Sequence, residues 1–217
     1  MTWVTVAVTP IEFLLAWELM GMMSFALVAF EYHARETMRA AWVYLLACHA
    51  GAAFLILMFV YGGSDNVPPS FMAAVIVLGM AGFGLKIGFP VLHVWLPEAH
   101  PAAPAPVSAV MSASMINLGF YGILRMLINS DGPLGIFGWA FLVLGLIGAL
   151  GGVLFALAQR NLKRLLAYSS VENMGIISIG FGLGFQPDFL CAGRCVTDDF
   201  FRLIFGARDI CYYFLNH

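Results

Sequence analysis

Six long apolar segments, separated by short polar stretches, dominate the pattern of the sequence. A helix needs about 20 consecutive, mostly apolar residues to cross the hydrocarbon core of a bilayer. The polar stretches between the segments are rich in glycine, proline, asparagine, aspartate and charged residues, which are typical of turns and loops. The pattern therefore predicts an all-α, polytopic membrane protein with about six transmembrane helices, near residues 8–30, 40–61, 70–96, 106–128, 134–158 and 165–185.

The composition agrees with membrane burial. Of the 217 residues, 62% are hydrophobic and 10% are charged, whereas a soluble domain carries about 25% charged residues. The formal net charge of −2 gives no electrostatic basis for a nucleic-acid partner. No basic region precedes the first apolar segment, and Glu12 and Glu18 interrupt it. We therefore interpret this segment as a membrane span and not as a cleaved signal peptide.

Basic residues in the short loops predict the orientation of the chain. Helices that alternate in direction place five basic residues on one side of the membrane and a single one, Arg125, on the other. Cytoplasmic loops carry the excess of lysine and arginine. We expect a multi-pass protein of the plasma (inner) membrane with its N-terminus outside, and the following basic residues on the cytoplasmic side: Arg35, Arg39, Arg160, Lys163 and Arg164.

The character of the chain changes after residue 185. The chain has 10 basic and 12 acidic residues, 22 in all, and seven of them fall within residues 186–217, which contain no clean apolar run. We expect a membrane domain over residues 1–185 and a divergent tail over 186–217. Cys191 and Cys195 in this tail bracket three residues, which is not a zinc or redox spacing. We predict no metal site and no bound cofactor.

The third apolar segment contains a charge and a cluster of prolines. Five of the ten prolines lie between Pro90 and Pro106. Because proline removes a backbone donor and clashes with the preceding turn, we expect this helix to be discontinuous near Gly88–Pro90. Lys86 lies at the break, and a lysine at the centre of a bilayer costs about 2.5–3.5 kcal/mol. Since apolar residues flank it on both sides, we predict that Lys86 has a function.

Glu18, in the run FLLAWELMGMM at 13–23, is the second charge in an apolar segment. It is either held neutral by hydrogen bonds or paired with Lys86. Pairing would offset part of the desolvation cost of both groups. An acid and an amine beside a broken helix that admits water form a candidate proton relay.

Four other polar residues are candidates for the same pathway. His93 and His100 flank the tripeptide LPE, and histidine titrates near neutral pH, so they would pass protons toward the cytoplasm or cap freed backbone groups. Glu98 would admit protons or cap a helix. Glu172, after YSSV, is a second candidate intramembrane acid. His49, in ACHAG, is expected to be a core histidine with its hydrogen bonds satisfied.

These residues resemble a known family. Lys86, Pro90 and His93, followed by WLP at 95–97, AH at 99–100, AP at 103–104 and YGILR at 121–125, are similar to the antiporter-like subunits of respiratory complex I. The same family includes Mrp-type cation/proton antiporters and membrane subunits of energy-converting hydrogenases. LLAWELM and NLKRLLAYSSVENMGII also match, and the spellings PEAHPAAP and SSVENMG resemble the hydrogenase-4 and formate hydrogenlyase branch. The resemblance covers residues 11 to about 185.

The resemblance implies a fold of two inverted helix repeats with one discontinuous helix in each. It also implies proton transfer along a polar axis at mid-membrane, driven by electron transfer in partner subunits. These partners would be other membrane subunits and, through them, hydrogenase or dehydrogenase subunits of a peripheral arm. The chain itself would be a non-redox subunit of an oxidoreductase complex. The family's glutamate falls on Glu18 and its lysine on Lys86, whereas its next axis residue falls on Asn117, which cannot titrate.

A second departure concerns length. Members of the family have more than a dozen spans, and this sequence predicts about six. Its last residues, YYFLNH at 212–217, resemble the start of the family's LNHAxFK helix. We therefore expect a fragment, a truncated gene product or a frameshifted tail. Two alternatives to a redox-driven proton-translocating subunit stay open: an Mrp-type Na⁺/H⁺ antiporter subunit, and a truncated structural subunit that conducts nothing.

Overall fold

The structure is a computed structural model that describes residues 1–63, 68–90, 92–128 and 134–185. The predictions for residues 186–217, the tail with Cys191 and Cys195 included, lie outside the described residues. All regular elements of the described part are helices. They are α1 (Thr2–Val6), α2 (Pro10–Val28), η1 (Ala29–Glu31), α3 (Arg35–Gly62), α4 (Pro69–Ile87), η2 (His93–Trp95), α5 (Leu96–Ala102), α6 (Ala105–Val110), the π-helix η3 (Met111–Met115), α7 (Ile116–Ile128), α8 (Leu134–Leu157) and α9 (Leu162–Gly184).

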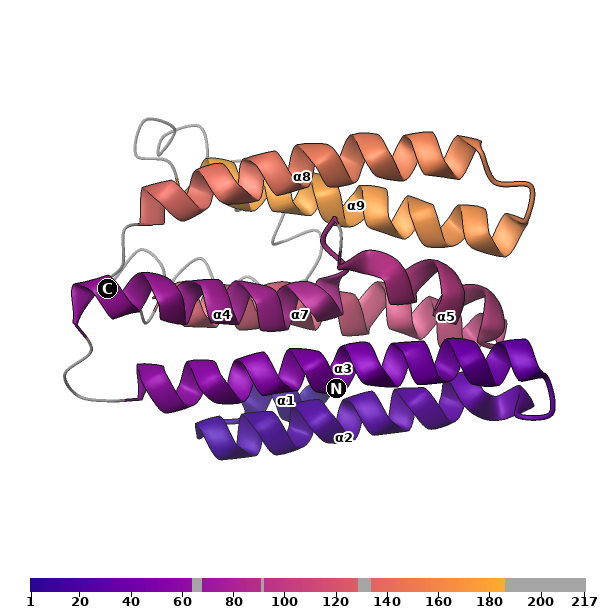
Figure 1. The fold of residues 1–217 in the computed structure, drawn as a ribbon, viewed down its shortest axis with the longest axis horizontal. Coiled ribbons are helices and arrows are strands. Elements are labelled where there is room, and N and C mark those ends of the chain that lie inside the picture. The colour runs from indigo at the N-terminus through magenta and orange to yellow at the C-terminus, as the bar shows by residue number, and fades with distance from the viewer. Residues whose placement is uncertain (64–67, 91, 129–133, 186–217) are drawn as a thin grey trace.

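The long helices lie alongside one another as a bundle (Figure 1). Helices α2 and α3 form one side of it, α8 and α9 form the opposite side, and α4, α5 and α7 lie between them. Helix α4 contacts both α3 and α7, and α5 contacts both α3 and α9. The segment around the predicted break therefore lies in the middle of the bundle.

The structure confirms an all-helical membrane fold, and each of the six predicted segments contains a helix. Among the described residues, four helices are long and apolar enough to cross a membrane: Pro10–Glu31, Arg35–Gly62, Ala105–Leu127 and Phe137–Leu157. The apolar part of α4, Phe71–Ile87, is shorter because the helix breaks after it. Helix α9 carries Lys163, Arg164 and Glu172, which lower its hydropathy. The total of six spans stays a prediction.

Local sequence signals set where several helices begin. Thr9 caps α2: its side chain accepts a hydrogen bond from the Glu12 backbone, and the Glu12 side chain accepts one in return from the Thr9 backbone. Such a reciprocal capping box satisfies two backbone donors that the first turn leaves free. Asn161 caps α9 by accepting from the Lys163 backbone. These caps lie at helix ends, where polar backbone groups need partners.

Small residues bring α8 and α9 into close contact. A Cβ added at Gly175 would lie 2.7 Å from the backbone oxygen of Gly145, which is too close for any larger side chain. Small residues at such contacts let two helix backbones approach each other within a membrane. The α8–α9 pair therefore packs backbone to backbone and supports α5 from one side.

Candidate functional site

The predicted helix break is present at Gly88. Helix α4 ends at Ile87, and Gly88 follows in the left-handed conformation with φ of 81°. Glycine adopts this conformation without the steric cost that a Cβ imposes. A Cβ at this position would also collide with the side chain of Leu96. The chain then turns through Phe89 before helix resumes at η2, so the break directly follows Lys86.

Lys86 is buried at this break, with 3% of the residue exposed. Its ammonium donates hydrogen bonds to the Tyr44 hydroxyl and to the Cys48 sulfur, both at 3.1 Å. It also lies 5.1 Å from the centre of the Tyr44 ring and 5.7 Å from that of Trp17, within range of cation–π attraction. On α2, a Cβ at Gly21 would lie 3.4 Å from Nζ. The amine is thus enclosed by α2 and α3.

Glu18 does not pair with Lys86 in the part of the chain that the structure describes. Its carboxylate lies 3.7 Å from Nε2 of His49, and their side chains are 31% and 54% exposed. Successive helical residues are rotated by about 100°. Trp17 and Gly21 occupy the face of α2 toward Lys86, so Glu18 is turned toward α3 and the bundle surface. The expectation that His49 is a core histidine is therefore wrong.

The two other histidines lie beyond the break. His100 is 4% exposed, and its Nδ1 lies 2.8 Å from the Ser108 hydroxyl. Nδ1 of His93 and Nε2 of His100 are buried without a hydrogen-bond partner among the described residues. Trp95 lies between the two and donates from Nε1 to the Leu85 carbonyl at 2.6 Å. This bond holds the resumed helix against the end of α4.

Glu98 lies at the surface, where basic residues of α9 meet α5. Arg164 lies 3.4 Å from its carboxylate, and both side chains are 47% exposed. Lys163 donates to the carbonyls of Pro101 and Ala103, at 3.2 and 3.4 Å, and so caps the C-terminal end of α5. An exposed ion pair of this kind contributes about 0–1 kcal/mol. These basic residues therefore join α9 to α5, besides their predicted role in topology.

Glu172 lies on α9 and is half-buried. Its backbone packs on α8, where a Cβ at Gly152 would lie 2.6 Å from the Glu172 nitrogen. Within the described ranges its side chain has no hydrogen bond or ion pair. In the same part of the chain, none of the other five predicted site residues bonds to Lys86: Glu18, His93, Glu98, His100 and Glu172.

The sequence analysis missed the residues that hold Lys86. Tyr44 and Cys48 lie four positions apart and so share one face of α3, which is a signal for a polar patch that sequence inspection could have used. The Tyr44 hydroxyl donates to Met115 Sδ at 3.2 Å, and the Ser24 hydroxyl, which donates to the Met20 carbonyl at 2.8 Å, lies 3.4 Å from the same sulfur. Met115 ends the π-helix η3, and π-helical turns occur frequently at functional sites.

Asn117 lies in the first turn of α7, the helix that follows this π-helix. Its Nδ2 donates to the Ala113 carbonyl at 2.7 Å, and its Oδ1 is buried without a hydrogen-bond partner in the described part of the protein. An amide holds hydrogen bonds but does not titrate near neutral pH. Asn117 therefore offers a site for water and not for a proton.

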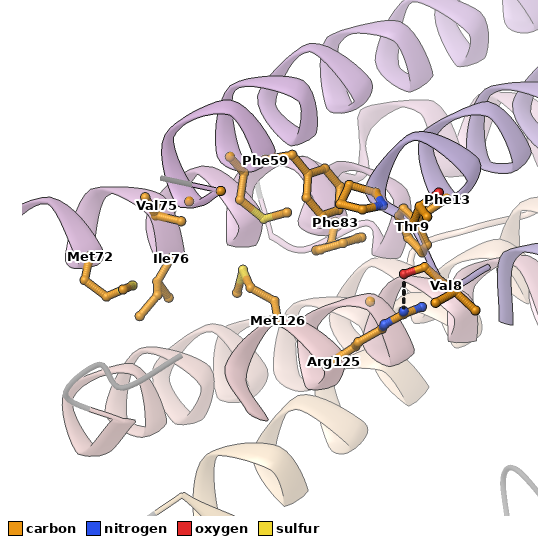
Figure 2. A pocket seen from close by; sticks show the side chains of 15 residues that line it. Val8, Thr9, Phe13, Phe59, Met72, Val75, Ile76, Phe83, Arg125 and Met126 are labelled. Carbon is orange, nitrogen blue, oxygen red and sulfur yellow. Dashed lines mark hydrogen bonds between the residues drawn. The ribbon is translucent and has the colours of Figure 1, made fainter. Parts of the chain in front are cut away.

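A separate cavity of about 310 Å³ lies between α2, α3, α4 and α7. Its walls are mainly apolar and include Phe13, Phe83 and Met126, and none of the six predicted site residues lines it. Arg125 lies at its wall (Figure 2) and donates to the carbonyls of Ala7 and Val8, at 2.6 and 3.3 Å. Arg125 thus binds carbonyls at the C-terminal end of α1. Within the described residues, no group of three or more histidine, cysteine, aspartate or glutamate side chains is arranged to hold a metal ion.

Comparison with known proteins decides the family. A family profile described as "NADH:quinone oxidoreductase/Mrp antiporter, TM" matches residues 9–189, which is most of the chain. The chain belongs to this family. The match contains both halves of the broken segment around Lys86 and all the long helices, so the resemblance inferred from the motifs is confirmed.

Named relatives within this antiporter family belong to hydrogenase and complex I-like assemblies. The chain is 34% identical to hydrogenase-4 component B of Escherichia coli over 220 residues, which cover 94% of the chain and 32% of the relative. It is 47% identical to formate hydrogenlyase subunit 3 of Escherichia coli over 109 residues, 50% of the chain and 18% of the relative. It is 35% identical to NADH-quinone oxidoreductase subunit N of Desulforudis audaxviator over 189 residues, which cover 77% of the chain and 36% of the relative. The chain spans between 18% and 36% of the length of these relatives.

Proposed function

We propose that this chain is a proton-translocating part of a membrane subunit in a hydrogenase- or complex I-like redox complex, with Lys86 carrying the proton. The observation that supports this most strongly is the environment of the amine. Lys86 is buried at a helix break, and neutral groups, Tyr44 and Cys48, accept its hydrogen bonds. A carboxylate in direct contact would fix the charged form, whereas neutral acceptors leave both protonation states accessible.

Polar atoms on the far side of the break extend the proposed path. His93 Nδ1, His100 Nε2 and Asn117 Oδ1 are buried and lack partners among the described residues. Buried polar groups are nearly always hydrogen-bonded, and ordered water supplies the bond where protein does not. We infer that water reaches this region and connects Lys86 with the end of the bundle where Glu98 lies.

The Glu18–His49 pair is a second pair of ionisable groups in this proposal. Both side chains are partly exposed on the α2–α3 side of the bundle. A charged pair exposed within the membrane needs a protein or aqueous neighbour, and another subunit or further helices would supply it. Glu18 would then regulate Lys86 through its charge and not through direct contact. Glu172, without a bond to the cluster, would be a separate acid on α9.

The proposed partners are the other membrane subunits of the complex and a peripheral hydrogenase or dehydrogenase arm that supplies the electrons. The chain would act in the inner membrane as a non-redox subunit. The test is proton translocation by inverted membrane vesicles that contain the complete complex, measured per electron transferred. Translocation abolished by an uncoupler and unchanged when sodium is omitted supports this proposal. Sodium-dependent translocation would instead favour the Mrp-type alternative.

The orientation of the chain gives a prediction of its own. We expect the N-terminus outside, with Arg35 and Arg160 both cytoplasmic, because the ends of α2 and α8 then face the side with most basic residues. Single cysteines introduced at these two exposed positions should react with an impermeant thiol reagent only from the cytoplasmic side. A cysteine at Gly63, the other end of α3, is the control and should react only from outside. Labelling of positions 35 and 160 from opposite sides would overturn the topology.

A further inference from the structure

The hydrogen bonds of the Lys86 amine go to a pair of residues on α3. An ammonium has three N–H donors and no acceptor, and two of these donors bind the Tyr44 hydroxyl and the Cys48 sulfur at 3.1 Å each. Tyr44 is 0% and Cys48 8% exposed, so bulk water does not compete for these bonds. The two residues are four positions apart on one helix, and α3 therefore presents both acceptors from a single rigid face.

The Tyr44 hydroxyl has its own proton engaged elsewhere. It donates to Met115 Sδ at 3.2 Å. The Ser24 hydroxyl lies 3.4 Å from the same sulfur and donates its proton to the Met20 carbonyl at 2.8 Å. A thioether accepts hydrogen bonds weakly and has no proton to pass on. The hydroxyl therefore turns a lone pair toward Lys86, and its proton points to an atom where no relay continues. This geometry holds the amine but does not carry its proton onward.

We propose that Tyr44 and Cys48 are positioning residues for Lys86, and that Met115 fixes Tyr44 as an acceptor. The proposal rests on the proposed function and goes beyond it, since it assigns to α3 and η3 the role of holding the amine. The two acceptors stabilise the ammonium by hydrogen bonding to the charged form. Met115 lies in the π-helix that precedes α7. A shift of that segment would therefore change how firmly Tyr44 holds the amine.

The ionisable groups nearest to the Lys86 amine come from several helices. Glu18 of α2 pairs with His49 of α3 at 3.7 Å. His100 of α5 lies behind Trp95, whose ring is 6.4 Å from the imidazole and 5.2 Å from the Tyr44 ring. None of these groups bonds to Lys86 within the described residues, so removing Tyr44 or Cys48 alters the direct contacts of the amine and leaves these groups in place.

The experiment measures protons translocated per electron against pH, in vesicles that contain the complete complex. Removal of one acceptor makes the ammonium release its proton more readily, so translocation is lost at lower pH. Loss of a hydrogen bond to a charged group corresponds to a shift of about one pH unit, or about tenfold. Tyr44→Phe should move the alkaline limb of this pH profile, where translocation is lost, to lower pH by about one unit. Tyr121→Phe, which removes a hydroxyl bonded to the Thr5 carbonyl, is the matched control and should not move it.

Cys48 and Met115 give independent arms. Cys48→Ala should shift the alkaline limb of the pH profile in the same direction as Tyr44→Phe. Cys48→Ser keeps a hydroxyl acceptor, so its alkaline limb should lie close to that of the unmodified protein. Met115→Leu keeps the volume but removes the sulfur, and should give a smaller shift. If the complex with Tyr44→Phe does not assemble, the positioning role is tested by the difference between the pH profiles of Cys48→Ala and Cys48→Ser.

Two failures are distinguishable by adding Lys86→Ala. If this variant translocates protons normally, the proposed function is wrong. If it is inactive while the profiles of Tyr44→Phe and Cys48→Ala superimpose on that of Tyr121→Phe, only the positioning role is overturned.

Discussion

Lys86→Ala is expected to reduce the protons translocated per electron to the background of uncoupled vesicles, while electron transfer continues. The amine is 3% exposed and lies directly before the helix break, and alanine offers no group that binds a proton there. The substitution leaves Tyr44 and Cys48 without the donor that they bind in the unmodified protein. Water that reaches the break would have to hydrogen-bond to them instead. Translocation and electron transfer are measured on the same vesicle preparation.

Lys163→Ala is the matched control for this loss. Lys163 is exposed and caps the C-terminal end of α5 through two carbonyls, so its replacement removes a lysine without touching the buried site. It should leave proton translocation near its normal level. Equal effects of the two substitutions would show that the loss at Lys86 reflects general damage to the bundle.

Gly88→Ala is expected to produce the second large effect, on stability and on translocation together. The φ of 81° costs any residue with a Cβ about 1–2 kcal/mol, and the new methyl group would collide with Leu96. Relief of this strain requires the end of α4 to move, and Lys86 lies two residues away. We expect a lower unfolding temperature of the purified complex in detergent and a loss of translocation.

Gly151→Ala is the control for the break. A Cβ at Gly151 would meet nothing within 4 Å, and alanine is the better helix former by about 1 kcal/mol. This variant should be as stable as the unmodified protein or more so. If Gly88→Ala unfolds at the same temperature as Gly151→Ala and translocates normally, the left-handed turn is not needed for the site.

The sequence predicted the features of the site that depend on local chemistry. A glycine with a proline two residues later, as at Gly88 and Pro90, favours the end of a helix whatever the fold around it, so the break and the burial of Lys86 beside it followed from a short segment. The apolar runs likewise predicted the helices. The family motifs identified the same lysine, because they lie in the same contiguous stretch.

The partner of Lys86 was not predictable in this way. Whether Glu18 or its neighbours Trp17 and Gly21 face the amine depends on how α2 is rotated against α3, and a helix that is apolar all round carries little periodic signal for that rotation. The same reason led to the wrong expectation for His49, since an apolar helix need not be covered on every face within one chain. The π-helix that places Met115 gives no pattern in the sequence.

The central claim is that Lys86 itself releases and rebinds the translocated proton, and Lys86→Arg tests it most directly. Arginine keeps a positive charge and the capacity to donate to Tyr44 and Cys48, but it does not release its proton in proteins. The measurement is the ratio of protons translocated to electrons transferred in vesicles that carry this variant. We predict a ratio close to that of Lys86→Ala. A normal ratio would show that Lys86 is a fixed charge or a packing element, and would contradict the account.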